Sequence, residues 1–372
     1  MKSMAKRSDE QYMKQALELA QQARGRTSPN PMVGALVVKG GAVVGQGYHK
    51  KAGQPHAEVL ALRGAGDLAR GATLFVTLEP CAHQGRTPAC APQVAQAGLR
   101  RVVAAMADPN PRVAGKGFAI LRNAGISVTT GVLESAARCM NAFYIKHITA
   151  GEPYVILKGA MTLDGKIATA AGASKWITGA EARRDVHELR RDVDAILVGV
   201  NTLLKDDPSL TCRVPGRPPQ PLRVVLDGNL RLRPGLKFVK NAGDGKSLVV
   251  TRIDADAKRI DTLRKAGCRV LQVRADKQGR LRIRDVVKEL GRMDVMSLLV
   301  EGGGAVHDAF FRARAVDKVV FYVAPKILGG AGSHSIVDGI GFRDLDKSLG
   351  LEFGPVTLLG RDLKIEAFPV SK

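Results

Sequence analysis

The sequence predicts an α/β protein of two domains. Its 372 residues exceed the usual size of a single domain. In both halves, short apolar runs typical of strands alternate with segments in which apolar residues recur at helical spacing. Such alternation is typical of helices packed on the faces of a sheet. The turn Gly151-Glu152-Pro153 interrupts it, so we expect domains at residues 1–150 and 151–372.

The first half is expected to begin with a helix. Ser8 to Gln11 has the form of a capping box, and Gly25 ends the apolar spacing that follows. The turn pair Gly40-Gly41 separates the first two expected strands. Strands are expected at residues 32–39, 42–48, 72–78, 101–106 and 126–130. Helices are expected at residues 56–62, 88–97 and 115–123 and, joining the two halves, at 133–149.

The second half repeats the alternation. Strands are expected at residues 154–160, 195–200, 222–226, 247–251, 269–273, 297–301 and 318–324. Helices are expected at 180–191, 255–265, 283–290 and 305–314. A hairpin of residues 356–359 and 363–368 is expected to close the chain.

The composition excludes several classes of protein. A hydrophobic content of 45% is ordinary for a globular protein. No apolar run reaches the roughly 18 residues of a membrane span, and the basic N-terminus lacks the apolar segment of a secretory signal. The five cysteines form no disulfide framework. We therefore expect a cytoplasmic protein with no membrane partner.

The net charge of +22 leaves more than one interpretation open. Such a charge is consistent with an enzyme whose substrate and cofactor are phosphorylated, or with a basic enzyme surface that has no binding role. It also suits nucleic-acid binding, but the charges run through both halves and aromatic residues make up only 4% of the chain. Few side chains are therefore available for base stacking. We expect no specific nucleic-acid partner.

A zinc motif is the most informative feature of the chain. His56-Ala57-Glu58, Pro80-Cys81 and Cys90 follow the H-x-E…P-C…C order of zinc-dependent nucleobase deaminases. Three ligands, His56, Cys81 and Cys90, leave one tetrahedral position for a water, whose pKa falls to ~7 on zinc. Glu58 is then the expected general acid and base. Eight residues, instead of two, separate the cysteines, but zinc requires only that the sulfurs converge. A nucleic-acid deaminase with a basic binding module remains the alternative function.

The second half has no G-x-G-x-x-G fingerprint at its first strand–helix turn. Glu301-Gly302-Gly303-Gly304 instead lies between an apolar strand and an expected helix. Glycines at such a turn let backbone N–H groups approach a phosphate, although a tight turn explains them equally well.

The segment from Pro80 to Cys90, PCAHQGRTPAC, resembles the cysteine loop of the bifunctional deaminase/reductase family of riboflavin biosynthesis. Further segments match that family in the expected order, at residues 28–34, 108–111, 158–166, 174–178 and 301–304. The resemblance implies a cytidine-deaminase-like three-layer first domain and a dihydrofolate-reductase-like second domain. It also implies Zn²⁺ and NADPH as cofactors, a phosphorylated pyrimidine substrate, and a homo-oligomer, dimer or tetramer.

The resemblance assigns further site residues by position in its motifs. The deaminase substrate would contact Asn30, His49, His83, Arg86, Asp108 and Asn110. NADPH would contact Ala160, Trp176, Thr202, Asp206, Gly302, Gly303 and Gly304. The reductase substrate would contact Lys158, Ser174, Arg190, Leu210, Arg213 and Glu301. Deamination would remove the 2-amino group of a diaminopyrimidinone ribosyl phosphate, and hydride from NADPH would then convert its ribosyl group to ribityl.

Overall fold

The structure is a computed structural model that describes residues 8–83, 88–111, 113–216, 218–339, 341 and 344–370. The chain divides into two compact units, Met1–Gly151 and Glu152–Lys372. None of the helices in the described ranges is long and apolar enough to cross a bilayer.

The first unit is built on a five-stranded sheet in the order β2-β1-β3-β4-β5. The strands are β1 (Gly34–Lys39), β2 (Ala42–Tyr48), β3 (Thr73–Val76), β4 (Arg101–Ala104) and β5 (Ser127–Thr130). β1 pairs antiparallel with β2 and β3, whereas β3, β4 and β5 are parallel. The helices of this unit are α1 (Asp9–Gln21), α2 (Ala57–Ala65), α3 (Cys90–Gln96), α4 (Lys116–Asn123), α5 (Glu134–Met140) and α6 (Ala142–Ala150). The capping box expected at Ser8 is present at the start of α1.

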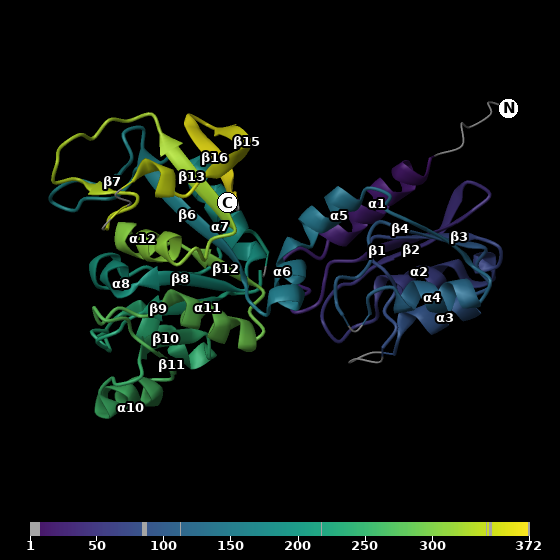
Figure 1. The fold of residues 1–372 in the computed structure, drawn as a ribbon, viewed down its shortest axis with the longest axis horizontal. Coiled ribbons are helices and arrows are strands. Elements are labelled where there is room, and N and C mark those ends of the chain that lie inside the picture. The colour runs from purple at the N-terminus through teal and green to yellow at the C-terminus, as the bar shows by residue number, and fades with distance from the viewer. Residues whose placement is uncertain are drawn as a thin grey trace. The chain divides into compact units, whose positions relative to one another are not determined.

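Glycines show that helices cover both faces of this sheet. A Cβ on Gly34 would lie 2.0 Å from the carbonyl oxygen of Ala16 in α1, and one on Gly47 would lie 2.5 Å from Leu60 in α2. Gly47 pairs with Ala35, the neighbour of Gly34 along β1. Because successive residues of a strand face opposite sides, α1 and α2 lie on opposite faces. The unit therefore has three layers (Figure 1).

The prediction of a single helix at residues 133–149 is wrong. The structure has two helices, α5 and α6, interrupted at Asn141. The buried Asn141 side chain accepts a hydrogen bond from the backbone N–H of Met32 (2.8 Å) and donates one to its carbonyl (3.0 Å). The break occurs at this contact with a distant segment.

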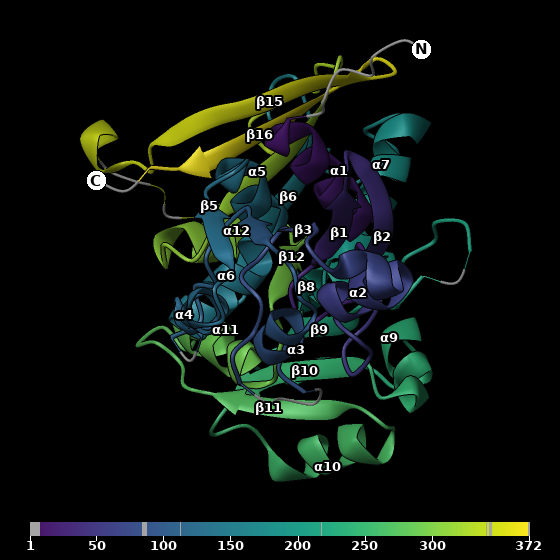
Figure 2. The same cartoon turned by 90° about the vertical axis from the view of Figure 1, so that its right-hand side faces the viewer.

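The second unit contains a nine-stranded sheet in the order β11-β10-β9-β8-β12-β6-β13-β16-β15. Figure 2 shows β11 at one edge and the β15–β16 hairpin at the other. The strands are β6 (Tyr154–Thr162), β8 (Ala195–Gly199), β9 (Leu222–Leu226), β10 (Ser247–Arg252), β11 (Arg269–Val273), β12 (Ser297–Val300), β13 (Lys318–Ala324), β15 (Leu351–Leu359) and β16 (Asp362–Pro369). From β11 to β13 in this order, neighbouring strands are parallel. β16 pairs antiparallel with β13 and with β15, and the β15–β16 hairpin is longer than the expected hairpin of residues 356–359 and 363–368.

Helices α7 (Ala180–Asp192), α8 (Val200–Asp206), α9 (Lys237–Lys240), α10 (Ala257–Lys265), α11 (Ile283–Arg292) and α12 (Gly304–Arg312) connect these strands. A small separate sheet joins β7 (Lys166–Ala168) to β14 (His334–Ser335). The core packs Val286 and Leu290 of α11 against Leu157 of β6 and Leu197 of β8.

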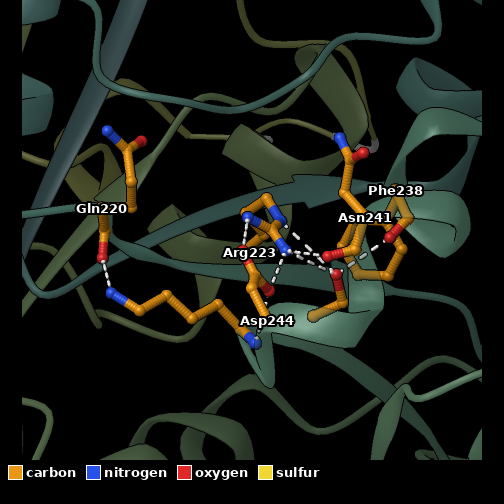
Figure 3. Close-up of polar contacts among 7 residues, drawn as sticks. Gln220, Arg223, Phe238, Asn241 and Asp244 are labelled. Carbon is orange, nitrogen blue, oxygen red and sulfur yellow. Dashed lines mark hydrogen bonds and ion pairs between the residues drawn. The ribbon is translucent and has the colours of Figure 1, made fainter.

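A buried arginine fastens the segment after β9 to the sheet (Figure 3). Arg223 is only 2% exposed, and its guanidinium donates to both carboxylate oxygens of Asp244 (2.9 and 2.6 Å) and to the carbonyl of Asn241 (3.0 Å). Ser247 donates in turn to the carbonyl of Phe238 (2.9 Å). A buried cation requires such partners, so this cluster is structural.

Candidate active sites

The first unit brings together the three residues of the zinc motif. His56 is the residue before α2, Cys90 is the first residue of α3, and Cys81 lies in the loop after β3. His56 Nδ1 lies 3.1 Å from Cys90 Sγ and 3.6 Å from Cys81 Sγ, and all three ligand atoms are within 4.8 Å of one another. Ligands at ~2.0 and ~2.3 Å from a tetrahedral zinc stand about 3.5 Å apart. The three side chains therefore fit zinc.

The electrostatics of this cluster favour a cation. A hydrogen bond with the Cys90 thiol lowers the pKa of Cys81 to about 4, and the same bond raises the pKa of Cys90. The backbone N–H of Cys90 also donates to Cys81 Sγ (3.3 Å). A hydrogen bond with Cys81 raises the pKa of His56. A thiolate is thus already favoured at Cys81, and thiolates are the form that binds metal.

Glu58 lies in the first turn of α2 and is 3% exposed. Burial raises the pKa of its carboxyl to about 7. A carboxyl with this pKa can take up and release a proton near neutral pH, as a general acid and base must. Its hydrogen bond with the Cys90 thiol places it against the candidate metal ligands.

Asn30 and His49 lie beside this cluster. Asn30 Nδ2 is 3.0 Å from His49 Nε2, and His49 Nδ1 is 3.3 Å from the carbonyl oxygen of Pro55. The His49 ring stands edge-on to the ring of His56, with centroids 5.1 Å apart. Burial lowers the pKa of His49, so the neutral imidazole donates to Pro55 and accepts from Asn30.

Asp108 and Asn110 form a second group on the loop after β4. Asp108 Oδ1 accepts hydrogen bonds from the Asn110 backbone N–H (2.9 Å) and from the Tyr144 hydroxyl (3.0 Å). Burial raises the pKa of Asp108. Sequence reasoning missed Tyr144, since nothing in its local sequence signals this contact. His83 is exposed, and Arg86 lies outside the described residues.

The second unit contains a cavity of about 590 Å³ beside α8 and the start of α12. Among the residues predicted to bind cofactor or substrate, five line it: Ser174, Thr202, Asp206, Gly303 and Gly304. Gly302 has no room for a side chain, because a Cβ there would lie 2.4 Å from Val306. Ala160 and Trp176 are not on this cavity wall; the Trp176 ring is 65% exposed and lies against the Arg183 guanidinium at 4.7 Å.

Three cations that sequence reasoning missed also line this cavity. They are Lys205, Arg231 and Arg280. Arg231 donates to Asn201 Oδ1 (2.7 Å), and Arg280 pairs with Asp276 (2.9 Å). Lys205 lies in α8, and Arg231 and Arg280 lie in separate loops; none of these segments carries a motif, so only the fold reveals that the three line one cavity. Guanidinium groups at a cavity wall suit phosphate oxygens.

Three of the six residues predicted for the reductase substrate, Lys158, Arg190 and Glu301, form a buried cluster around an ion pair. Arg190 of α7 donates two hydrogen bonds of 2.8 Å to the carboxylate of Glu301, at the end of β12. Burial alone would raise the pKa of Glu301, but the charge of Arg190 lowers it to about 2. Burial lowers the pKa of Lys158 on β6, and Glu301 opposes this effect.

The remaining two predicted residues lie in the segment after α8. Leu210 is buried with a positive φ of 50°, and the exposed Arg213 contacts His187 at 3.3 Å.

Comparisons with known proteins agree with this division of the chain. Residues 6–106 match the cytidine and deoxycytidylate deaminase zinc-binding region, and residues 153–365 match the RibD C-terminal domain. The riboflavin biosynthesis protein RibD of Aquifex aeolicus is 45% identical over 97% of this chain and 99% of its own length. The RibD of Escherichia coli is 43% identical over 86% of this chain and 89% of its own length.

Solved structures give the same result. Acinetobacter baumannii RibD superposes with a TM-score of 0.88, at 38% identity over 98% of this chain and 99% of that chain. A Thermotoga maritima protein described as a diaminohydroxyphosphoribosylaminopyrimidine deaminase/5-amino-6-(5-phosphoribosylamino)uracil reductase has a TM-score of 0.85, at 36% identity over 97% and 99%. The predicted fold class and cofactors are confirmed. This chain therefore belongs to the RibD family of riboflavin biosynthesis proteins and is a bifunctional enzyme, a zinc-dependent deaminase and an NADPH-dependent reductase.

Proposed function

We propose that this chain deaminates 2,5-diamino-6-(5-phosphoribosylamino)pyrimidin-4(3H)-one and then reduces the ribosyl group of the product to ribityl. We assign deamination to residues 1–150 and reduction to residues 151–372. The observation that carries the proposal is the convergence of His56, Cys81 and Cys90 beside the buried Glu58. The Thermotoga relative is named for both reactions.

In the first unit, His56, Cys81 and Cys90 would hold the zinc ion, which when bound activates water at neutral pH. Glu58 takes one proton from the attacking water and passes it to the ring nitrogen. It then takes the proton of the hydroxyl group now on the ring carbon and passes it to the amino group, which leaves as ammonia. Its pKa of about 7 makes both transfers accessible near neutral pH. Burial keeps bulk water from competing for that proton.

The substrate is held by the groups around Glu58. The base and the ribose phosphate are held by Asn30, His49, His83, Arg86, Asp108 and Asn110. The hydrogen bond with His49 orients the Asn30 amide, and the Tyr144 hydroxyl fixes the Asp108 carboxylate.

In the second unit, NADPH supplies hydride when it is bound. Thr202, Asp206 and the backbone of Gly303 and Gly304 bind it in the cavity, with the first turn of α12 facing its phosphates. Gly302, Ala160 and Trp176, which do not line the cavity, are assigned to NADPH by the resemblance of their segments to the family's motifs. Lys205, Arg231 and Arg280 supply positive charge along the cavity for the remaining phosphate groups.

The reductase substrate is held at the buried ion pair. Lys158, Arg190 and Glu301 contact the sugar, and Arg190 and Glu301 hold each other in place through two hydrogen bonds. Ser174, Leu210 and Arg213 complete the contacts, and the Arg213 guanidinium suits the sugar phosphate.

The net charge of +22 is the one observation that favours a nucleic-acid substrate. We assign this charge instead to an enzyme that binds phosphorylated small molecules, because three of the cations line the cofactor cavity. Conversion of a base in RNA or DNA with salt-sensitive binding would favour the alternative.

We also propose a cytoplasmic homo-oligomer. The five cysteines form no disulfide bonds, as expected in a reducing compartment.

The proposed oligomer rests on an exposed apolar face. In the β15–β16 hairpin, Phe353, Val356 and Leu358 are 74%, 57% and 66% exposed. Apolar faces of this kind are typically covered by a partner, and we assign the partner to a second copy of this chain. Light scattering should show an oligomer that Phe353→Ser weakens; a monomeric wild type would contradict it.

Release of ammonia from the substrate, with zinc measured in the same preparation, tests the deaminase assignment. The wild type should bind zinc and release ammonia, and Cys90→Ser should lose both. Cys139→Ser is the matched control, because Cys139 is exposed and is not one of the three clustered residues. Unchanged zinc content in Cys90→Ser would show that this loop does not supply the third ligand.

A further inference from the structure

Glu79 is a buried carboxylate that the chemistry above does not use. It lies between β3 and Cys81 and is 2% exposed. Its two oxygens accept hydrogen bonds from four backbone N–H groups, those of Asp108 (3.1 Å), Gly115 (3.0 Å), Gly117 (2.9 Å) and Phe118 (3.3 Å). A carboxylate held by several N–H donors is among the strongest polar anchors in a protein.

Close packing reinforces these bonds. A Cβ on Gly117 would lie 2.0 Å from the carbonyl oxygen of Pro80 and 3.2 Å from Glu79 Cγ. The first turn of α4 therefore rests directly on the Glu79-Pro80 backbone, without a side chain between them. The backbone N–H of Glu79 also donates to the carbonyl of Met106 (3.0 Å).

Glu79 connects two parts of the candidate deaminase site, one through its backbone and the other through its carboxylate. Cys81, a candidate metal ligand, follows Glu79 by two residues. Asp108, whose N–H the Glu79 carboxylate holds, fixes the backbone of Asn110 (2.9 Å) and contacts Tyr144 (3.0 Å). One side chain thus links the loop that carries Cys81 to the loop that carries Asp108 and Asn110.

We propose that Glu79 is a positioning residue of the deaminase. It fixes the distance between the cysteine loop and the substrate-binding loop, so that the reacting ring carbon lies within reach of the activated water. A misplacement of about 1 Å between reacting groups costs up to ~100-fold in rate. This inference rests on the proposed deamination and on the assignment of Asp108 and Asn110 to substrate binding.

Glu79→Gln tests the proposal in the full-length enzyme. The amide has the same size, but its nitrogen cannot accept the two N–H groups that face one carboxylate oxygen. We expect an unchanged zinc content and a kcat for deamination lowered by about tenfold or more, because the misplaced ring carbon is attacked more slowly. Reduction of the deaminated intermediate, assayed separately, should be unchanged. Glu134→Gln is the matched control, because Glu134 forms an exposed ion pair with Arg138 on the surface.

The outcomes separate positioning from a merely structural role. Thermal unfolding identifies an assay temperature at which Glu79→Gln and Glu134→Gln are both folded. The kcat values are expressed per bound zinc. Wild-type kcat and KM in Glu79→Gln would overturn the proposal, as would loss of zinc, which would place the effect on the metal loop. Should Glu79→Gln fail to fold, Glu79→Asp keeps the charge with a shorter reach and should also lower kcat. A wild type without deamination would refute the proposed function instead.

Discussion

Replacing Glu301 by glutamine should destabilise the second unit. The carboxylate accepts two 2.8 Å hydrogen bonds from Arg190, and the two side chains are 8% and 12% exposed. Glutamine keeps the size but not the charge, so it imitates the protonated acid. The difference between the usual pKa and a pKa of about 2 corresponds to roughly 3 kcal/mol. Removing one partner of a buried ion pair typically lowers the free energy of unfolding by about 3–5 kcal/mol, which agrees with the value obtained from the pKa.

Urea unfolding at neutral pH measures this loss. Circular dichroism follows both units, and fluorescence follows Trp176, the single tryptophan, in the second unit. Glu289→Gln is the matched control, because Glu289 pairs with Arg292 on the surface, with side chains 33% and 72% exposed. An exposed pair is worth less than about 1 kcal/mol. A loss in Glu301→Gln no larger than in the control would refute the reasoning.

The same pair predicts a pH dependence. The pKa of Glu301 is lower in the folded protein than in the unfolded chain, so its contribution to stability is complete above the unfolded pKa. It is lost as the pH falls toward about 2. The difference in unfolding free energy between wild type and Glu301→Gln should therefore shrink in that range, and a constant difference would contradict the assignment.

Three further predictions concern the two sites. Glu58→Gln should keep zinc yet lose deamination, measured as ammonia release; unimpaired turnover would exclude Glu58 as general base. Truncation after residue 150 should leave a folded deaminase by circular dichroism, since the first unit is compact by itself; an insoluble product would show that the units depend on each other. Arg231→Ala should weaken NADPH binding, measured by cofactor fluorescence, more than NADH binding; equal losses would place Arg231 away from the additional phosphate of NADPH.

Local sequence predicted those features that depend on local patterns. Most strands and helices follow apolar periodicity, and His56, Cys81 and Cys90 were predicted because these ligand types form a recognisable motif. The structure places their ligand atoms together. The break at Asn141 could not be predicted, because its partner, Met32, lies 109 residues away in sequence.

Other features depend on contacts that no sequence pattern reports. The four partners of Glu79 are backbone groups between Asp108 and Phe118, so no side-chain motif identifies them. Arg231 and Arg280 come from separate loops and meet only at the cavity. Charged residues in loops are usually solvated, and the chain has 57 Lys and Arg. The sequence alone therefore does not indicate which of them line the cavity.

The central claim is that one chain carries out both reactions in order. The most direct test is NADPH oxidation, followed by absorbance, with the diaminopyrimidinone ribosyl phosphate as substrate, before and after zinc chelation. We predict oxidation that stops when zinc is removed and resumes when the deaminated intermediate is supplied, because reduction requires the deaminated product. Oxidation that is indifferent to zinc, or ammonia release without any oxidation of NADPH, would contradict the account.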